Sequence, residues 1–255
     1  MAKPYTLKKS LGQHFLHDEQ ICERIVGSLT VKPKMNLLEI GPGGGAITKY
    51  LINIEDINYK AIEVDEEKVR YLEKTYKALE GKIIEQDILQ ANAPYEGKFS
   101  IIGNFPYNIS SPILFKVLDW EEDVEEVIGM FQKEVALRVA SDSGSKQYGI
   151  LSVLIGAFFK VDYLFDVDEQ AFTPPPKVKS GVIRLTNLNN PHGIIDKRKF
   201  KVLVKTAFNQ RRKMLRNALA GILPKEVLEE HPFMTKRAEQ LSIEDFVSLY
   251  KAYFS

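Results

Sequence analysis

NLLEIGPGGGAIT, residues 36–48, joins an apolar segment to a glycine-rich turn and to the start of a helical pattern. The apolar segment is typical of a buried strand, and the glycines would let the backbone approach a ligand closely. Gly41, Gly43 and Ala46 have the GxGxxG/A spacing of nucleotide-binding turns, which suits either a dinucleotide or S-adenosylmethionine. Glu39 directly precedes the turn, and its carboxylate would repel a pyrophosphate but attract a sulfonium and an amino group. We therefore favour S-adenosylmethionine, although Glu39 can also be interpreted as a buried acid that caps nearby amides.

Strand and helix patterns alternate on both sides of this turn. Asp18 can cap a helix that ends near Leu29, and Asp65 can open another. The other expected elements are strands at 36–41, 59–64, 82–85, 99–104 and 124–131, helices at 46–52, 110–118 and 133–139, and an antiparallel edge hairpin formed by 161–167 and 178–185. This alternation predicts an α/β fold with a mainly parallel, doubly wound, Rossmann-like sheet.

The composition changes at NLNNPHG, residues 187–193, which is the best candidate for a linker. Beyond it the segments 199–208, 212–221 and 243–254 all have helical spacing of apolar residues. We therefore expect two domains: a ligand-binding domain over 1–188 that contains the sheet, and a small C-terminal all-α domain over 189–255.

Two further acids stand at the ends of predicted strands. Glu63 ends the second strand, where an acid would accept the two hydroxyls of a ribose, and Asp87 follows the third strand, where it could bind the amine of an adenine. Taken singly, Glu63 can be a surface acid and Asp87 a turn former. Because ligands of open α/β sheets bind along the carboxyl edge, the series of Glu39, Glu63 and Asp87 indicates one cofactor pocket.

The stretch IIGNFPYNISSPILF, residues 101–115, ends an apolar strand in Asn104, Phe105, Pro106 and Tyr107. The amide oxygen of Asn104 and the carbonyl of Pro106 could accept the two hydrogens of an adenine amine while the Tyr107 ring stacks on the base. This geometry would direct the nitrogen lone pair at a methyl donor. The simpler interpretation is a strand followed by a proline turn.

Composition and charge narrow the classes of function. The chain has 44% hydrophobic and 27% charged residues, no apolar run near the roughly 20 residues that span a bilayer, and no apolar core of a signal peptide at its basic start, so we expect a cytoplasmic protein. The single cysteine, Cys22, excludes an internal disulfide. The four histidines lack ligand spacing such as HExxH, and we expect no metal.

The net charge of +1 conceals two basic segments. Residues 1–16 carry three lysines and no acid, and residues 196–216 carry nine basic residues and one acid. A basic run is often only a solvated helix face, but two such runs beside a net acidic body fit a polyanionic partner. The residues that we expect to contact such a partner are Lys8, Lys9, Arg211, Arg212 and Lys213.

Seven motifs in order, GQHFL, EIGPG, IEVD, QDIL, NFPYNIS, FTPPPKVKS and FNQRRKMLRN, make the chain resemble the KsgA family of small-subunit ribosomal RNA adenine dimethyltransferases. The resemblance extends from about residue 8 to residue 217. It implies a Rossmann-like class I methyltransferase that uses S-adenosylmethionine to dimethylate the N6 amines of two adjacent adenosines near the 3′ end of 16S ribosomal RNA during ribosome biogenesis. It also implies that the small ribosomal subunit or its precursor is the partner and that the enzyme acts as a monomer.

The same resemblance implies roles for individual residues. The implied cofactor contacts are His14, Leu16, Gly41, Glu63, Asp87 and Asn104, and the implied catalytic residues are Asn104, Pro106, Tyr107 and Phe172, with Phe172 facing Tyr107 across the target base. Two positions depart from the family pattern, which more often has Asn at the position of His14 and Leu at that of Phe105. A backbone contact at residue 14 would survive the first change, and the second retains an apolar side chain.

Three other functions are compatible with these motifs. The erythromycin-resistance methyltransferases, which modify large-subunit RNA, share the earlier motifs and are the nearest alternative. A noncatalytic assembly factor could keep the fold and hold the methyl donor only as a ligand. A DNA adenine methyltransferase would use a similar pocket on another nucleic acid.

Overall fold

The structure is a computed structural model in which residues 14–254 are described. The predicted RNA contacts Lys8 and Lys9 lie outside the described residues, and their roles stay predictions. None of the helices in this described part of the chain is both long and apolar enough to cross a bilayer.

The chain divides into two compact units. The first contains the chain up to Ala136 together with Asp162–Asn187, and the second contains Leu137–Val161 and the chain from Leu188 onward. The predicted boundary at residue 188 is close to one of these divisions, but residues 137–161 group with the C-terminal helices. The physical reason is the apolar helix α6 (Ile150–Gly156), which has five consecutive buried residues and packs against α7 (Lys197–Asn209).

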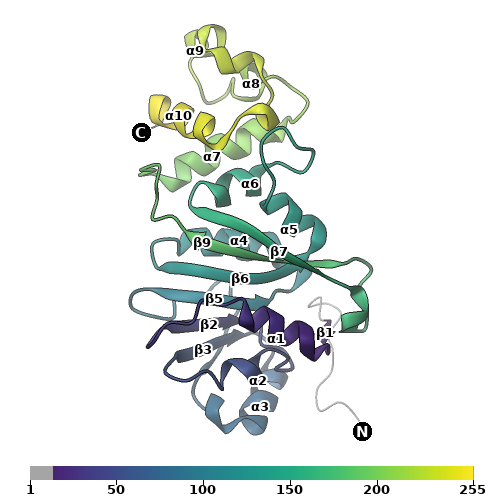
Figure 1. Cartoon of the computed structure of the whole chain (residues 1–255). Coiled ribbons are helices and arrows are strands. Elements are labelled where there is room, and N and C mark those ends of the chain that lie inside the picture. Colours follow the sequence, from purple (N-terminus) through teal and green to yellow (C-terminus); the bar gives the residue numbers. More distant parts are fainter. Residues whose placement is uncertain (1–13, 255) are drawn as a thin grey trace. The chain divides into compact units, whose positions relative to one another are not determined.

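The first unit is built on a seven-stranded sheet with the order β4-β3-β2-β5-β6-β9-β7 (Figure 1). Its strands are β2 (Asn36–Ile40), β3 (Asn58–Glu63), β4 (Ile83–Glu85), β5 (Phe99–Asn104), β6 (Val124–Gln132), β7 (Phe159–Val167) and β9 (Ser180–Asn187). The strands from β4 to β6 pair in parallel, and β9 pairs antiparallel with β6. The predicted parallel, doubly wound sheet is confirmed, and the two strands of the expected hairpin are neighbours at the edge.

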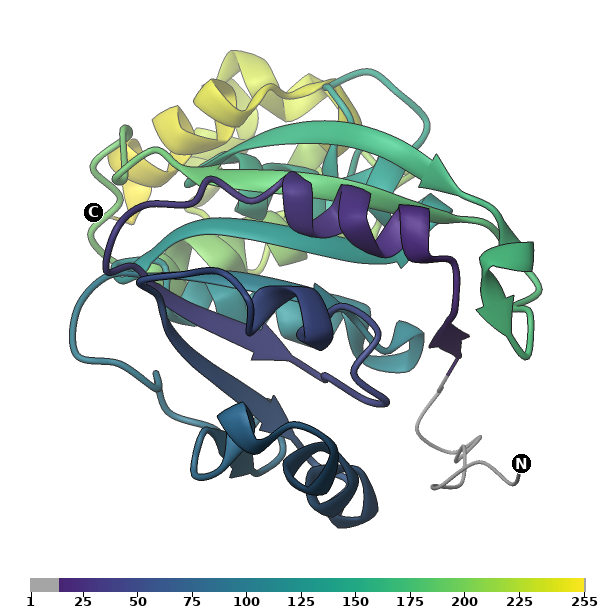
Figure 2. The ribbon, with the colours of Figure 1, turned by 60° about the horizontal axis from the view of Figure 1, so that its bottom comes forward.

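Helices cover both faces of this sheet. They are α1 (Glu19–Gly27), α2 (Thr48–Leu51), α3 (Glu66–Thr75) and α4 (Ser110–Asp119), and α5 (Lys133–Val139) begins in the first unit and ends in the second. As Figure 2 shows, α1 crosses in front of the sheet, and its Cys22 and Ile25 join a core that includes Met130 of β6. The side chains of Asp18 and Asp65 cap α1 and α3, as the sequence predicts.

The strand order places a topological switch between β2 and β5. From β2 the chain continues to β3 and β4 on one side, and it then returns to β5 on the other side of β2. The loops that leave the carboxyl ends of β2 and β5 therefore diverge, and this is the position where open α/β sheets bind ligands. Gly41 follows β2 there, and Asn104 ends β5.

The second unit is helical, with α6 and α7 followed by three shorter or terminal helices. These are α8 (Leu215–Ala218), α9 (Lys225–Glu230) and α10 (Ile243–Tyr253). Aromatic rings join α7 to α10: the ring centroids of Phe200 and Tyr250 are 5.7 Å apart, and those of Phe208 and Phe246 are 5.8 Å apart. The helix expected over 212–221 is only one turn, because residues 210–213 form a turn after α7 and Met214 is extended.

Candidate active site

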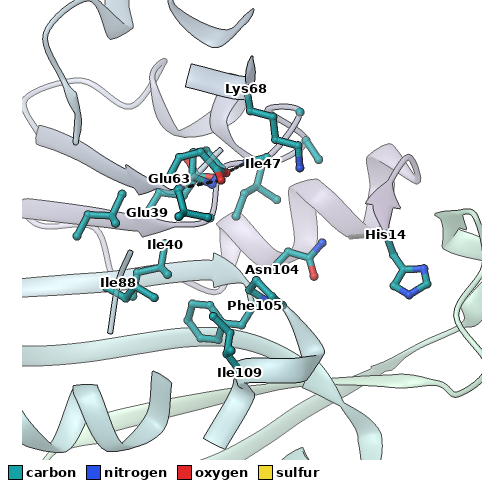
Figure 3. Close-up of a pocket in the computed structure, with 18 of the residues that line it drawn as sticks. His14, Glu39, Ile40, Ile47, Glu63, Lys68, Ile88, Asn104, Phe105 and Ile109 are labelled. Atoms are coloured by element: carbon teal, nitrogen blue, oxygen red, sulfur yellow. Dashed lines mark hydrogen bonds between the residues drawn. The ribbon is translucent and has the colours of Figure 1, made fainter. Parts of the chain in front are cut away.

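A cavity opens at the carboxyl edge of the sheet, beside the switch between β2 and β5 (Figure 3). Eight of the predicted site residues line it: His14, Leu16, Gly41, Glu63, Asp87, Asn104, Pro106 and Tyr107. The ends of the four neighbouring strands β4, β3, β2 and β5, together with the segment at residues 14–16, thus bring together residues that lie up to 93 positions apart, from His14 to Tyr107. All of the lining residues belong to the first unit.

The glycine turn forms one wall of this cavity. Gly41 and Gly43 have φ values of +69° and +58°, in the left-handed region that side chains disfavour. The Gly41 N–H donates to the carbonyl of Ile62 at 2.9 Å, which ties the turn to β3. A Cβ atom added at Gly41 would lie 3.8 Å from Pro106 Cδ, so the turn adjoins the NFPY segment. The glycines therefore bring bare backbone to the cavity.

Glu63 holds the glycine turn through its carboxylate. Its side chain is 5% exposed, and Oε1 accepts the N–H groups of Val64 and Asp65, both at 3.0 Å. Oε2 accepts the Gly43 N–H at 3.0 Å and keeps capacity for a further donor. Asp87, on the neighbouring strand end, is exposed and accepts the Leu89 N–H at 2.9 Å. Both carboxylates are thus fixed by backbone donors beside the cavity.

Glu39 is the most deeply buried acid of the site. It is 1% exposed, and its two oxygens accept the hydroxyls of Thr48 at 3.0 Å and Tyr59 at 2.5 Å. Burial raises the pKa of Glu39 to about 7, the two hydroxyl donors partly oppose that shift, and the nearby charge of Glu63 adds to it. A cationic ligand in the cavity would favour the ionised form of this carboxyl group.

The raised pKa of Glu39 predicts a pH-dependent stability. Between the ordinary pKa of 4.5 and the folded value of about 7, the unfolded chain is ionised at Glu39 while the folded chain holds the proton. The free energy of unfolding should therefore decrease by about 3 kcal/mol through this group as the pH rises across that window, and level off above it. Urea denaturation from pH 5 to pH 8 should show this slope. The variant Glu39→Gln should lose it, and an equal slope in both proteins would contradict the prediction.

The NFPY segment brings an amide and a ring to the opposite wall. Asn104 points into the cavity in Figure 3, and within residues 14–254 its side-chain amide has no hydrogen-bond partner. The Pro106 carbonyl accepts the Ile109 N–H at 3.2 Å and the Ser110 hydroxyl at 3.3 Å, so part of its acceptor capacity is already used. Phe105 is buried in the core, which agrees with the expected apolar role.

Tyr107 carries a second ring on one face. The ring centroids of His14 and Tyr107 are 5.6 Å apart with an angle of 30° between the planes, and His14 Nδ1 lies 2.8 Å from the Pro174 carbonyl oxygen. The Tyr107 hydroxyl lies 2.5 Å from the Ser180 hydroxyl. Burial raises the pKa of Tyr107, so the phenol stays neutral at physiological pH.

Phe172 is not at this cavity. Its ring is 2% exposed and belongs to the hydrophobic core, because strand β8 (Phe172–Thr173) pairs antiparallel with β1 (Phe15–Leu16) and sets Phe172 opposite Leu16. Phe172 is therefore not among the residues that line the cavity, and its role opposite Tyr107 across a target base stays a prediction. The ring that stacks on Tyr107 is that of His14.

The basic residues predicted to contact RNA lie in the second unit, in the turn that follows α7. Arg211 donates to the carbonyls of Lys146 at 2.6 Å and Tyr148 at 3.2 Å, so it fixes the loop before α6. Arg212 and Lys213 are exposed. The turn therefore presents three solvent-accessible cations, and one of them, Arg211, also holds the loop before α6.

A charged residue that lines the cavity was missed by the sequence analysis. Lys68, on α3, is 3% exposed and reaches the cavity wall beside the glycine turn. In the sequence it belongs to the charged run EVDEEK, which is typical of a solvated helix start. The sequence feature that could have identified Lys68 as a lining residue is its position. It stands three residues after the cap Asp65, in the first turn of a helix that begins at the cavity edge.

No group of three or more His, Cys, Asp and Glu side chains suited to a metal ion occurs among the residues that the structure describes. The acids of the cavity are instead satisfied by backbone N–H groups and by hydroxyls. Cys22 lies in the core, and burial raises the pKa of its thiol to about 12, so it is a packing residue.

Comparison with solved structures supports the class of protein that this geometry defines. A dimethyladenosine transferase from Plasmodium falciparum superposes with a TM-score of 0.81 at 24% identity, covering 94% of this chain and 97% of that one. The 23S rRNA methyltransferase ErmE superposes with a TM-score of 0.70 at 22% identity, covering 94% and 100%. The fold, with a glycine turn and acids along its carboxyl edge, is that of the Rossmann-like methyltransferases.

The sequence comparisons show the family. The family model "Ribosomal RNA adenine dimethylase" matches residues 5–254. Proteins named "Ribosomal RNA small subunit methyltransferase A" are 51% identical in Cytophaga hutchinsonii, over 95% of both chains, and 50% identical in Flavobacterium johnsoniae, over 95% of this chain and 94% of that one. The chain belongs to the ribosomal RNA adenine dimethylase family.

Proposed function

We propose that this enzyme transfers methyl groups from S-adenosylmethionine to the N6 amines of two adjacent adenosines near the 3′ end of small-subunit ribosomal RNA. The observation that carries the proposal is the Asn104 amide, which stands at the end of β5, points into the cavity and lines it together with Tyr107. The names of the relatives, which specify the small subunit, favour that RNA over the large-subunit alternative.

The cavity suits the proposed methyl donor. S-adenosylmethionine supplies a methyl group activated by a sulfonium, and the acids Glu39, Glu63 and Asp87 complement its positive charges. Glu63 Oε2 accepts one backbone N–H and keeps lone-pair capacity for ribose hydroxyls. Asp87 is exposed to the cavity and can accept from an adenine amine. The bare backbone at Gly41 permits close approach.

The chain's own residues would orient the target amine. The Asn104 oxygen is available to accept one hydrogen of the amine. The Pro106 carbonyl can accept the other hydrogen, because the Ser110 hydroxyl that donates to this carbonyl at 3.3 Å also lies 3.1 Å from the Tyr107 carbonyl and can donate there instead. The Tyr107 ring would stack on the base, and the His14 ring occupies one of its two faces in this structure. Orientation supplies much of the acceleration in such a transfer, and no strong general base is required.

An adenosine must leave its stack to enter this cavity, at a cost of a few kcal/mol that is smallest in loops and unpaired ends. Phosphate contacts can offset that cost, and the exposed Arg212 and Lys213 are suited to make them. We propose the small ribosomal subunit or its precursor as the partner, with the enzyme acting as a monomer in the cytoplasm.

The deciding experiment offers labelled S-adenosylmethionine with unmethylated small and large ribosomal subunits, and with duplex DNA, in parallel reactions. Mass mapping should find dimethyladenosine in small-subunit RNA only. Label in large-subunit RNA would indicate the activity of the erythromycin-resistance enzymes, and label in DNA would indicate a DNA methyltransferase. If the protein binds the donor but methylates none of the three substrates, it is a noncatalytic binding factor.

We expect the salt dependence of RNA binding to depend on Arg212 and Lys213. Each phosphate contact releases condensed cations, so the double variant Arg212→Ala/Lys213→Ala should reduce the slope of log affinity against log salt by about 1.4 to 1.8. The triple variant that adds Arg211→Ala should also loosen the loop at residues 146–148. Filter binding from 50 to 300 mM salt measures the slope. An unchanged slope in the double variant would remove both residues from the RNA surface.

A further inference from the structure

A buried lysine lies among the acids of the cavity. Lys68 is 3% exposed and lines the cavity together with Glu39, Glu63 and Asp87. Among the described residues that line the cavity, it is the only lysine or arginine. Its Nζ lies 3.9 Å from the position that a Cβ atom would take at Gly43, so the ammonium adjoins the glycine turn. The proposed chemistry of adenine does not use this group.

Burial of an ammonium is costly unless anionic or hydrogen-bonding groups surround it. An apolar side chain such as Met or Leu could cover the same wall without that cost. Lys68 also interacts with other groups of the protein. A cation in an acidic cavity is suited to an anionic group of the ligand.

The order of the other residues indicates which part of the donor lies near Lys68. In Figure 3, Ile88, the chain neighbour of Asp87, and Lys68 lie on opposite sides of Glu63. If the adenine of the donor binds at Asp87 and its ribose at Glu63, the amino-acid end extends toward Lys68 and Asn104. That end carries the donor's only anionic group, a carboxylate, which the neighbouring acids would otherwise repel.

We infer that Lys68 binds the carboxylate of the methyl donor and so selects donors that carry this group. The inference rests on the proposed function, because it takes S-adenosylmethionine as the ligand. Lys68 thereby sets both the affinity for the donor and the direction in which the donor lies in the cavity.

The test compares two ligands that differ only in the carboxylate: S-adenosylmethionine and decarboxylated S-adenosylmethionine. In titration calorimetry the full-length protein should bind the first about 10- to 100-fold more tightly, as expected for a charge-assisted hydrogen bond. Lys68→Met should lose that preference through weaker binding of S-adenosylmethionine, with binding of the decarboxylated ligand unchanged or stronger. Lys68→Arg should restore part of the preference.

The matched control is Lys74→Met, which changes an exposed lysine on the same helix and should leave the preference intact. If Lys68→Met weakens both ligands equally, Lys68 only supports the wall, and the inference is overturned. If the wild-type protein binds the two ligands with nearly equal affinity, the inference is overturned as well, whether or not the variants fold. If the wild-type protein binds neither ligand, the donor assignment itself fails and this inference fails with it.

Discussion

Asn104→Ala should reduce methyl transfer to small-subunit RNA by at least about 10³-fold while the affinity for RNA changes by less than about 3-fold. The side-chain amide of Asn104 has no hydrogen-bond partner within residues 14–254, so it is available to hold a hydrogen of the target amine. Loss of a positioned polar group that acts on the reacting centre typically costs about 10² to 10³ in rate, and misorientation of the amine adds to that. Single-turnover transfer of labelled methyl groups, with donor and RNA at saturation, isolates this step.

The control for this variant is Asn92→Ala, which removes an exposed amide from the same unit without touching the cavity. It should transfer methyl groups at the wild-type rate. Thermal unfolding of both variants tests whether the fold is intact. Transfer by Asn104→Ala within 10-fold of wild type would show that the amine is oriented by other groups, and the proposed role of Asn104 would have to be abandoned.

The sheet and the edge residues could be predicted because strand ends are local features of a sequence. In a parallel sheet every carboxyl end lies at one edge, so Glu63, Asp87 and Asn104 converge whatever the exact packing of the helices. The caps Asp18 and Asp65 are equally local, and both form as expected.

The missed features depend on contacts between distant segments. Phe172 is buried in the core because β8 pairs with β1. The paired residues Leu16 and Phe172 are 156 positions apart in the sequence, and no local pattern predicts that pairing. In the sequence Lys68 has the pattern of a solvated residue, and only the contact between its side chain and the glycine turn shows that it lines the cavity. The sequence likewise does not indicate that Arg211 donates to two carbonyls of the loop at residues 146–148. Residues 137–161 join the second unit through packing of α6 on α7, which composition alone does not indicate.

Glu63→Gln should lower the affinity for S-adenosylhomocysteine by about 100-fold or more. The carboxylate accepts three backbone N–H groups, two at Oε1 and one at Oε2, and we assign its spare acceptor capacity to ribose hydroxyls. A Gln side chain must turn its NH₂ group toward at least one of these N–H donors, which costs about 1 to 3 kcal/mol for an unsatisfied buried group. It also loses the charge that strengthens a hydroxyl hydrogen bond. Titration calorimetry measures the affinity, and urea denaturation measures the loss of stability.

The two consequences of Glu63→Gln can be separated with a second ligand and a matched variant. The 2′,3′-dideoxy analogue of S-adenosylhomocysteine has no ribose hydroxyls for Glu63 to bind. Its affinities for the wild-type protein and for Glu63→Gln should therefore differ only through the weaker hold of the variant on the glycine turn. Glu85→Gln changes the exposed residue that pairs with Glu63 across β3 and β4 and should leave both affinities unchanged. If Glu63→Gln weakens the dideoxy analogue as much as the parent ligand, Glu63 acts only through Gly43, and the ribose must be held by other residues.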